Sequence, residues 1–182
     1  MLRLCYELNR YSTDIDFWFI RKIDQKTYFN NLKGYLGEFY EVTDAQAKFN
    51  TLLLEIRGRN YPKRLKIEIR KEFKECDTQE RIAFSKYSTS QVVLRVATLE
   101  QAMKNKIKAA LDRKDIRDFF DIEFILKQGV ALSCKKAELL ALKAILSGFK
   151  ENEYKVALGS LLDADTRKYY VKNRFDYLLS KI

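Results

Sequence analysis

Acidic and apolar residues alternate in the stretch DIDFWF, and this alternation constrains the fold more than any other feature of the chain. Successive side chains of a strand point to opposite faces of its sheet, so Asp14 and Asp16 share one face. Ile15, Phe17 and Phe19 share the other. Neighbouring carboxylates repel each other, and a bound cation is the usual remedy. The stretch therefore predicts a half-buried strand that presents a metal-binding acid pair.

A second stretch, LKIEIRK, shows the same alternation and places Glu68 on a polar face with Lys66 and Arg70. If this strand neighbours the first, Asp14, Asp16 and Glu68 converge. Three acids on adjacent strands can hold two divalent ions, which clamp the attacking and leaving oxygens in phosphoryl transfer. The alternative is that Glu68 only alternates on a solvated face among basic neighbours.

The hydrophobic patterning divides the chain near residue 97. We expect an α+β fold, in which residues 1–97 form an α/β domain with a small mixed sheet and flanking helices, and residues 98–182 form a helical bundle. The expected elements of the first part are a helix end within 2–9, strands over 13–20, 49–57, 64–71 and 91–97, and a helix over 23–42. The second part predicts helices over 99–113, 115–129, 135–148, 151–162 and 165–182, the first capped by Thr98 and the second ended by Gly129.

Histidine is absent from the sequence. Its absence excludes Ser-His and Cys-His catalysis as well as histidine metal ligands. A metal here must be held by oxygen, which favours Mg²⁺ or Mn²⁺.

Three points of composition bear on location and partners. The cysteines, Cys5, Cys76 and Cys134, are odd in number and far apart, which is typical of reduced thiols in a cytoplasmic protein. No signal peptide opens the sequence and no apolar run approaches the length of a membrane helix, so no membrane partner is expected. The net charge of +10 favours a polyanionic partner such as nucleic acid.

The helical part contains a second polar cluster in LDRKDIRDFFDI. Asp118 and Asp121 are three residues apart and Arg117 and Asp121 four apart, so a helix brings them to one face. The alternative is ordinary i,i+4 salt bridging on a solvated helix.

The preceding helix carries Lys106 and Arg113 on one face, with small Ala109 and Ala110 between them. A gap lined by small residues and framed by cations could admit a triphosphate. Further on, RKYYVKNRFDYLL interleaves aromatic and basic residues. This pattern is compatible with aromatic side chains that stack on RNA bases, although an amphipathic core helix explains it as well.

Taken in order, these segments resemble the AbiEii nucleotidyltransferase family, toxins of bacterial toxin–antitoxin and phage-defence systems. The resemblance rests on R-Y-S-T-D-I-D-F, where the family shows R-x-S-x-D-x-D-F, and on L-K-I-E-I. It continues in K-I-K-A-A-L-D-R and R-D-F-F-D-I, where the family has K-x-x-A-L-x-x-R and R-D-x-x-D.

The resemblance implies a role for each matching residue. Asp14 and Asp16 would be the metal-binding pair of a nucleotidyltransferase fold, with Glu68 as the third metal ligand and a candidate base. Asp118 would complete the catalytic set. The residues implied to bind the nucleotide are Ser12, Lys106, Arg113, Arg117 and Asp121. The family transfers a nucleoside monophosphate from an NTP to an acceptor, so the expected partners are NTP, Mg²⁺ or Mn²⁺, tRNA or another RNA, and a cognate antitoxin.

The sequence departs from the family at its start. The family has a K-G-G-[ST]-A-L run, whose Gly-Gly turn cradles the triphosphate, and Leu2 aligns with the final Leu of that run. The first domain is thus expected to be N-terminally truncated, either through the assigned start or through true loss of the turn.

Two other functions fit the sequence. One is a non-catalytic module that binds RNA or an antitoxin, a degenerate relative with vestigial carboxylates. The other is a metal-dependent nuclease, since Glu68-Ile69-Arg70 loosely fits an E-x-[KR] strand. The nuclease function leaves the Asp-x-Asp pair and the Arg-Asp-x-x-Asp helix unexplained.

Overall fold

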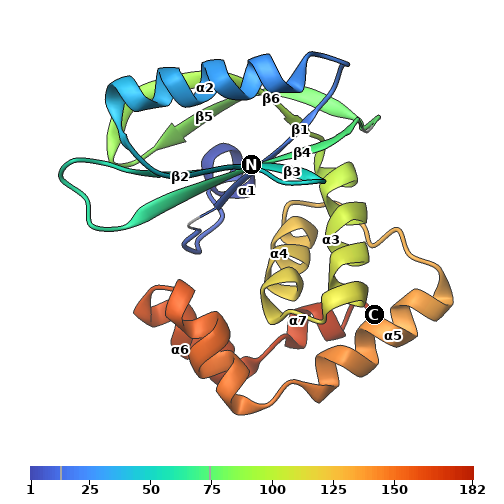
Figure 1. Cartoon of the computed structure of the whole chain (residues 1–182). Helices are drawn as coiled ribbons and strands as arrows, with labels where there is room; N and C mark the ends of the chain where they lie inside the picture. Colours follow the sequence, from blue (N-terminus) through green and yellow to red (C-terminus); the bar gives the residue numbers. More distant parts are fainter. Residues whose placement is uncertain (13, 74) are drawn as a thin grey trace. The chain divides into compact units, whose positions relative to one another are not determined.

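The computed structural model describes residues 1–12, 14–73 and 75–182, and the chain is drawn in Figure 1. It contains two compact units. The first combines Met1–Tyr11 with Asp77–Ile182, and the second is the continuous segment Ser12–Cys76. The expected boundary near residue 97 falls inside the first unit, between the end of a strand at Ala97 and the start of a helix at Leu99.

The second unit is a four-stranded sheet with one long helix. The sheet order is β1-β4-β3-β2, with β1 parallel to β4 and the other neighbours antiparallel, which confirms the predicted mixed sheet. Its elements are β1 (Asp14–Phe19), α2 (Gln25–Phe39), β2 (Glu41–Ala47), β3 (Thr51–Arg57) and β4 (Arg64–Phe73). Of the predicted first strand, Thr13 lies outside the described residues.

One face of this sheet is apolar because β4 alternates and every second residue of β3 from Leu52 to Ile56 is apolar. Leu52, Leu54 and Ile67 pack with Phe29 of α2 in a single core cluster, and Figure 1 shows α2 lying along the sheet. The period of two therefore sends the acids of β1 and β4 to the face that α2 does not cover.

The prediction of a helix over residues 23–42 is wrong at its end. The helix α2 stops at Phe39, and Glu41 already belongs to β2. Strand β2 pairs antiparallel with β3, and the Glu41 carboxylate accepts hydrogen bonds from Arg57 across the pair. Its sequence, EVTDAQA, lacks bulky apolar residues, so pairing with β3 rather than local propensity makes it a strand.

The first unit contains one hairpin and the remaining helices. The sequence did not predict β5, which pairs antiparallel with β6. The described elements of this unit are α1 (Leu2–Tyr6), β5 (Thr78–Ser85), β6 (Ser88–Ala97), α3 (Leu99–Arg113), α4 (Ile116–Lys127), α5 (Lys136–Gly148), η1 (Glu153–Leu158), η2 (Gly159–Leu161), α6 (Ala164–Asn173) and α7 (Asp176–Leu179).

Two helix ends follow the sequence prediction. The Thr98 side chain accepts a hydrogen bond from the backbone N–H of Gln101 at 3.1 Å, which caps α3. After α4, Gly129 adopts a φ of 90°, a conformation that favours glycine and ends the helix.

Helix α4 lies at the centre of the core of the first unit. Phe119, Ile122 and Ile125 are fully buried and belong to the same cluster as Phe175 and Leu178 from the end of the chain. The burial of Phe175 and Leu178 confirms that the aromatic tail packs in the core, but the single helix predicted over 165–182 is wrong, because α6 ends at Asn173, α7 begins at Asp176 and Phe175 lies in the turn between them.

A buried carboxylate ties α4 to the last two helices. Glu123 is 1% exposed and accepts hydrogen bonds from the Tyr170 hydroxyl at 2.7 Å and the Leu178 backbone N–H at 3.2 Å. Lys127 adds an ion pair at 2.7 Å. Burial, followed by the nearby charge of Glu123, raises the pKa of Tyr170. Both oxygens of Glu123 are therefore satisfied, as a buried charge requires.

Candidate functional site

The site residues predicted from the sequence fall into two groups, one in each compact unit. In the second unit, Asp14, Asp16 and Glu68 form what we call the acidic row. In the first unit, Asp118 and Asp121 form the aspartate cluster with Arg10, Lys106 and Arg113.

Strand pairing builds the acidic row. Because β1 and β4 are parallel neighbours, Asp14 stands beside Lys66 and Asp16 beside Glu68. Residues in register on adjacent strands point to the same face, so Asp14, Asp16 and Glu68 share one face, as the alternation predicted. Ser12 precedes the row and donates its hydroxyl proton to the backbone oxygen of Asp14 at 3.1 Å.

Lys66 is a member of this face that the sequence analysis did not single out. Its Nζ lies 2.9 Å from Glu68 Oε1. The hydrogen bond with Glu68, and then the charges of Asp14, Glu68 and Asp16, raise the pKa of Lys66 against a smaller opposing effect of burial. Its place on the polar face of LKIEIRK was the available signal. The three acids thus share their face of the sheet with the positively charged side chain of Lys66.

The donors of the acidic row are carboxylate oxygens, the ligand type that Mg²⁺ and Mn²⁺ prefer. Within residues 1–12, 14–73 and 75–182, no three acid, cysteine or histidine side chains are grouped closely enough to hold a metal ion. The Lys66 pair occupies an oxygen of Glu68. The row thus offers the right ligand type on one face, but among the described residues its three carboxylates are not gathered into a metal site, and Glu68 is paired with Lys66.

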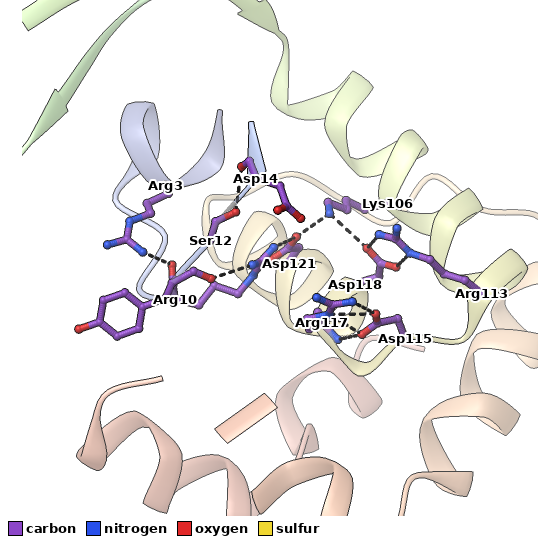
Figure 2. Close-up of polar contacts among 11 residues, drawn as sticks. Arg3, Arg10, Ser12, Asp14, Lys106, Arg113, Asp115, Arg117, Asp118 and Asp121 are labelled. Carbon is purple, nitrogen blue, oxygen red and sulfur yellow. Dashed lines mark hydrogen bonds and ion pairs between the residues drawn. The ribbon is translucent and has the colours of Figure 1, made fainter. Parts of the chain in front are cut away.

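The aspartate cluster lies where α3 and α4 pack together, and Figure 2 shows its hydrogen bonds and ion pairs. The Asp118 carboxylate accepts hydrogen bonds from Arg113 Nε at 2.6 Å, from Arg113 Nη2 at 2.7 Å and from Lys106 Nζ at 3.2 Å. Lys106 Nζ also lies 2.6 Å from Asp121 Oδ2. One lysine thus bridges both aspartates.

Burial distinguishes this cluster from ordinary surface ion pairs. Asp118 and Asp121 are 0% and 1% exposed, and their partners come from α3 and from Arg10 rather than from one turn along α4. The alternative of i,i+4 salt bridges on a solvated helix is therefore wrong for these two residues.

Arg10 is the cluster member that the sequence analysis missed. It donates from Nε and Nη2 to the two carboxylate oxygens of Asp121. Burial alone would raise the pKa of Asp121, but the Arg10 hydrogen bond and the Lys106 charge outweigh it and hold that pKa below its ordinary value. Arg10 opens the R-Y-S-T-D-I-D-F stretch, and two adjacent buried acids require nearby cations, which was the available signal.

Two features of this region bear on the expected phosphate contacts. Arg117 pairs with Asp115, the residue that caps α4, through Nη2 and Nε. The gap beside the alanines is also filled on one side, because Ala110 is fully buried in the core. Lys106 and Arg113 nevertheless share one face of α3, where both contact Asp118.

Among the described residues, no helix has both the length and the apolar character needed to cross a bilayer.

Comparison with solved structures shows the fold. The crystal structure of JHP933 from Helicobacter pylori is 21% identical, with a TM-score of 0.53 over 99% of this chain and 81% of that one. The structure of a candidate nucleotidyltransferase from H. pylori is 20% identical, with a TM-score of 0.57 over 99% of this chain and 83% of that one. No curated protein matches the chain.

Comparison with protein families identifies the relatives. The family model described as nucleotidyl transferase AbiEii toxin, type IV TA system, matches residues 1–174, nearly the whole chain. The segments that carry both residue groups lie within the match. The chain therefore belongs to the AbiEii family of nucleotidyltransferase toxins.

Proposed function

We propose that this protein transfers a nucleoside monophosphate from an NTP to a hydroxyl of an RNA acceptor, with tRNA as the acceptor and Mg²⁺ or Mn²⁺ as the cofactor. The observation that carries the proposal is the register of β1 and β4, which puts Asp14, Asp16 and Glu68 on one face of a mixed sheet. The net charge of +10 is suited to a polyanionic acceptor. Family membership implies the nucleotide substrate and a cognate antitoxin.

In this proposal the acidic row holds the metal. Asp14 and Asp16 supply carboxylate oxygens from β1, and Glu68 joins them when its pair with Lys66 opens. A bound divalent ion would neutralise charge on the triphosphate and orient it for in-line displacement.

The reaction forms one bond and breaks one bond. The acceptor hydroxyl oxygen attacks the α-phosphorus, the bond from that phosphorus to the oxygen bridging to the β-phosphate breaks, and pyrophosphate leaves. Glu68 takes the hydroxyl proton as the general base. Ser12 contributes to nucleotide binding beside Asp14.

The aspartate cluster supplies the cationic contacts of the proposal. Lys106 and Arg113 contact the nucleotide phosphates, and Asp118 holds both side chains at 2.6 to 3.2 Å so that they are positioned before substrate arrives. Asp121 fixes Lys106 from the other side. Arg117, which pairs with Asp115, belongs to the rim of this cluster.

The test incubates the purified chain with each labelled NTP, Mg²⁺ or Mn²⁺, and total bacterial tRNA. Label on tRNA is expected with the unmodified chain and is expected to disappear in the Asp14→Asn/Asp16→Asn double variant. A matched control, Asp165→Asn on the surface of α6, removes a carboxylate that is 95% exposed and should leave labelling unchanged.

The other outcomes separate the competing functions. RNA that becomes shorter without NTP consumption would indicate a nuclease. Binding of RNA or of the antitoxin with no label under any condition would indicate a non-catalytic module, and labelling by the double variant would contradict the proposed acidic row.

A further inference from the structure

We propose that a cavity beside α1, at the turn between β5 and β6, binds a nucleotide of single-stranded RNA by stacking its base. The proposal deepens the proposed function, since RNA is the acceptor proposed there. We call this site the aromatic cavity. Its volume is about 260 Å³, and all of its lining residues belong to the first compact unit.

Three aromatic rings line this one cavity. Tyr11 is 52% exposed, Phe84 37% and Tyr87 71%. Single exposed aromatics are normal on a protein surface, but a cluster around a hollow usually marks a binding surface. Every base has a π-face, so exposed rings bind single-stranded nucleic acid with little dependence on sequence.

Basic side chains stand next to these rings. The Arg3 guanidinium carbon lies 4.9 Å from the centre of the Tyr11 ring, and Arg3 Nη1 donates to the backbone oxygen of Arg10 at 3.0 Å. Lys86 Nζ lies 5.3 Å from the centre of the Tyr87 ring. Tyr11 and Tyr87 thus each lie beside a cation that can contact the phosphate of a stacked nucleotide.

The cation–aromatic pattern continues beyond the cavity along α1 and β5. The Arg81 guanidinium carbon lies 4.9 Å from the centre of the Tyr6 ring, and Gln79 donates to the Tyr6 hydroxyl at 2.8 Å. A strand leaving the cavity along this face would meet a further ring and a further positive charge.

Acidic groups line the cavity as well. The lining contains Glu7 and Asp163 against Arg3, Arg10 and Lys86, and Arg10 is itself paired with Asp121, so the cations that would meet a phosphate are Arg3 and Lys86 beside the rings. The Asp163 carboxylate is already engaged in capping α6, and it also accepts a hydrogen bond from the Asn9 side chain at 2.6 Å.

Size and polarity select the ligand class. A volume of about 260 Å³ lies just under the range of about 300–1,000 Å³ typical of pockets for drug-sized ligands, which suits one nucleotide. An apolar peptide segment would desolvate Arg3 and Lys86 without pairing them, at a cost in affinity. A nucleotide provides a ring for the aromatics and a phosphate for the cations.

The experiment measures binding of a fluorescent single-stranded RNA of about ten nucleotides, within the site sizes of such proteins, by anisotropy at several salt concentrations. Tyr87→Ala is expected to weaken binding about five- to a hundredfold. Lys86→Ala is expected to reduce the slope of log affinity against log salt by about 0.7, the contribution of one phosphate contact to a single strand. Both residues are exposed turn residues, so the fold should tolerate the changes.

Matched controls are Tyr35→Ala and Lys33→Ala, exposed residues of α2 that do not line the cavity. They should leave RNA affinity and its salt dependence unchanged. The same RNA as a duplex should bind more weakly than the single strand, because its bases are already stacked.

Three results would overturn the proposal: no binding of single-stranded RNA by the unmodified chain, equal affinity for Tyr87→Ala and the unmodified chain, or tighter binding of the duplex. The outcome is separable from that of the proposed function. RNA binding that depends on Tyr87 but comes without nucleotide transfer would support the aromatic cavity and contradict the proposed transferase. Nucleotide transfer combined with an RNA affinity that Tyr87→Ala leaves unchanged would contradict the cavity and support the transferase.

Discussion

Arg10 and Asp121 form a two-point ion pair, with Nε 2.7 Å from Oδ1 and Nη2 2.8 Å from Oδ2. The pair joins the segment after α1 to α4, across 111 residues of sequence. The Asp121 side chain is 1% exposed and that of Arg10 15%. The planar guanidinium matches both oxygens of a carboxylate, a geometry that lysine cannot reproduce.

Removing this arginine should destabilise the first unit. Breaking a buried ion pair costs about 3–5 kcal/mol, and we expect Arg10→Ala to fall at the lower end because Lys106 still contacts Asp121. Urea unfolding followed by circular dichroism measures the change. As a control, Arg57→Ala removes the exposed pair with Glu41 and should cost less than about 1 kcal/mol. Equal costs for the two variants would show that burial of the pair does not matter.

The buried carboxylate of Glu123 gives a second test of stability. Tyr170→Phe removes one hydroxyl donor to Glu123 while keeping the ring, and should lower the free energy of unfolding by about 1–3 kcal/mol. The neighbouring Tyr169 is 45% exposed, so Tyr169→Phe should change it by less than about 0.5 kcal/mol. If Tyr170→Phe were as stable as the unmodified chain, Lys127 and Leu178 alone would be sufficient for Glu123.

Acid sensitivity should depend in part on Asp163. Hydrogen bonds from the backbone and side chain of Thr166 lower its pKa from 3.8 to about 2. A lowered folded-state pKa stabilises the protein above pH 3.8, and this contribution is lost as the pH falls from 3.8 towards about 2. Asn also caps helices well, so Asp163→Asn should show a flatter dependence of stability on pH in that window. Thermal melts between pH 5 and 2.5 compare the variants, and parallel curves would contradict the prediction.

Metal affinity should depend on Lys66. Its ammonium pairs with Glu68, so it competes with any cation for the acidic row. We expect Lys66→Met to tighten Mn²⁺ binding about five- to tenfold, from a charge interaction of about 1 kcal/mol at 4 Å in water that grows at lower dielectric. Titration calorimetry without nucleotide gives the dissociation constant. Lys63→Met, an exposed residue before β4, is the control, and similar affinities for both variants would argue against competition.

The fold was predictable where the pattern was strong. The alternation around Asp16 and Glu68 gave the strand pair and the shared face, because a period of two leaves only one choice of buried side. Thr98 and Gly129 gave helix ends through local hydrogen bonding and backbone conformation. Strand β2 was not predictable from its own residues, because its pairing with β3 overrides a weak local preference.

The candidate site was predictable in its acids and less so in its cations. The spacing of Asp118 and Asp121 marked them as candidate site residues. Which basic side chains neutralise their charge depends on packing between distant segments of the chain. Arg10 reaches Asp121 from the start of the chain, whereas Arg117, closer in sequence, turns to Asp115. Pairing of long charged side chains is decided by tertiary geometry, which spacing along a helix does not contain.

The division of the chain has a consequence for how the molecule is made. The second unit is one uninterrupted segment, so all of it leaves the ribosome before most of its neighbour is synthesised, and domains generally fold as units in the order of synthesis. The first unit is split around that segment. Its opening eleven residues must wait for α4, more than a hundred residues later, before Arg10 can meet Asp121. Its assembly therefore includes a long-range loop closure, the slow kind of step in folding, and a toxin built in this way completes its aspartate cluster only late in translation.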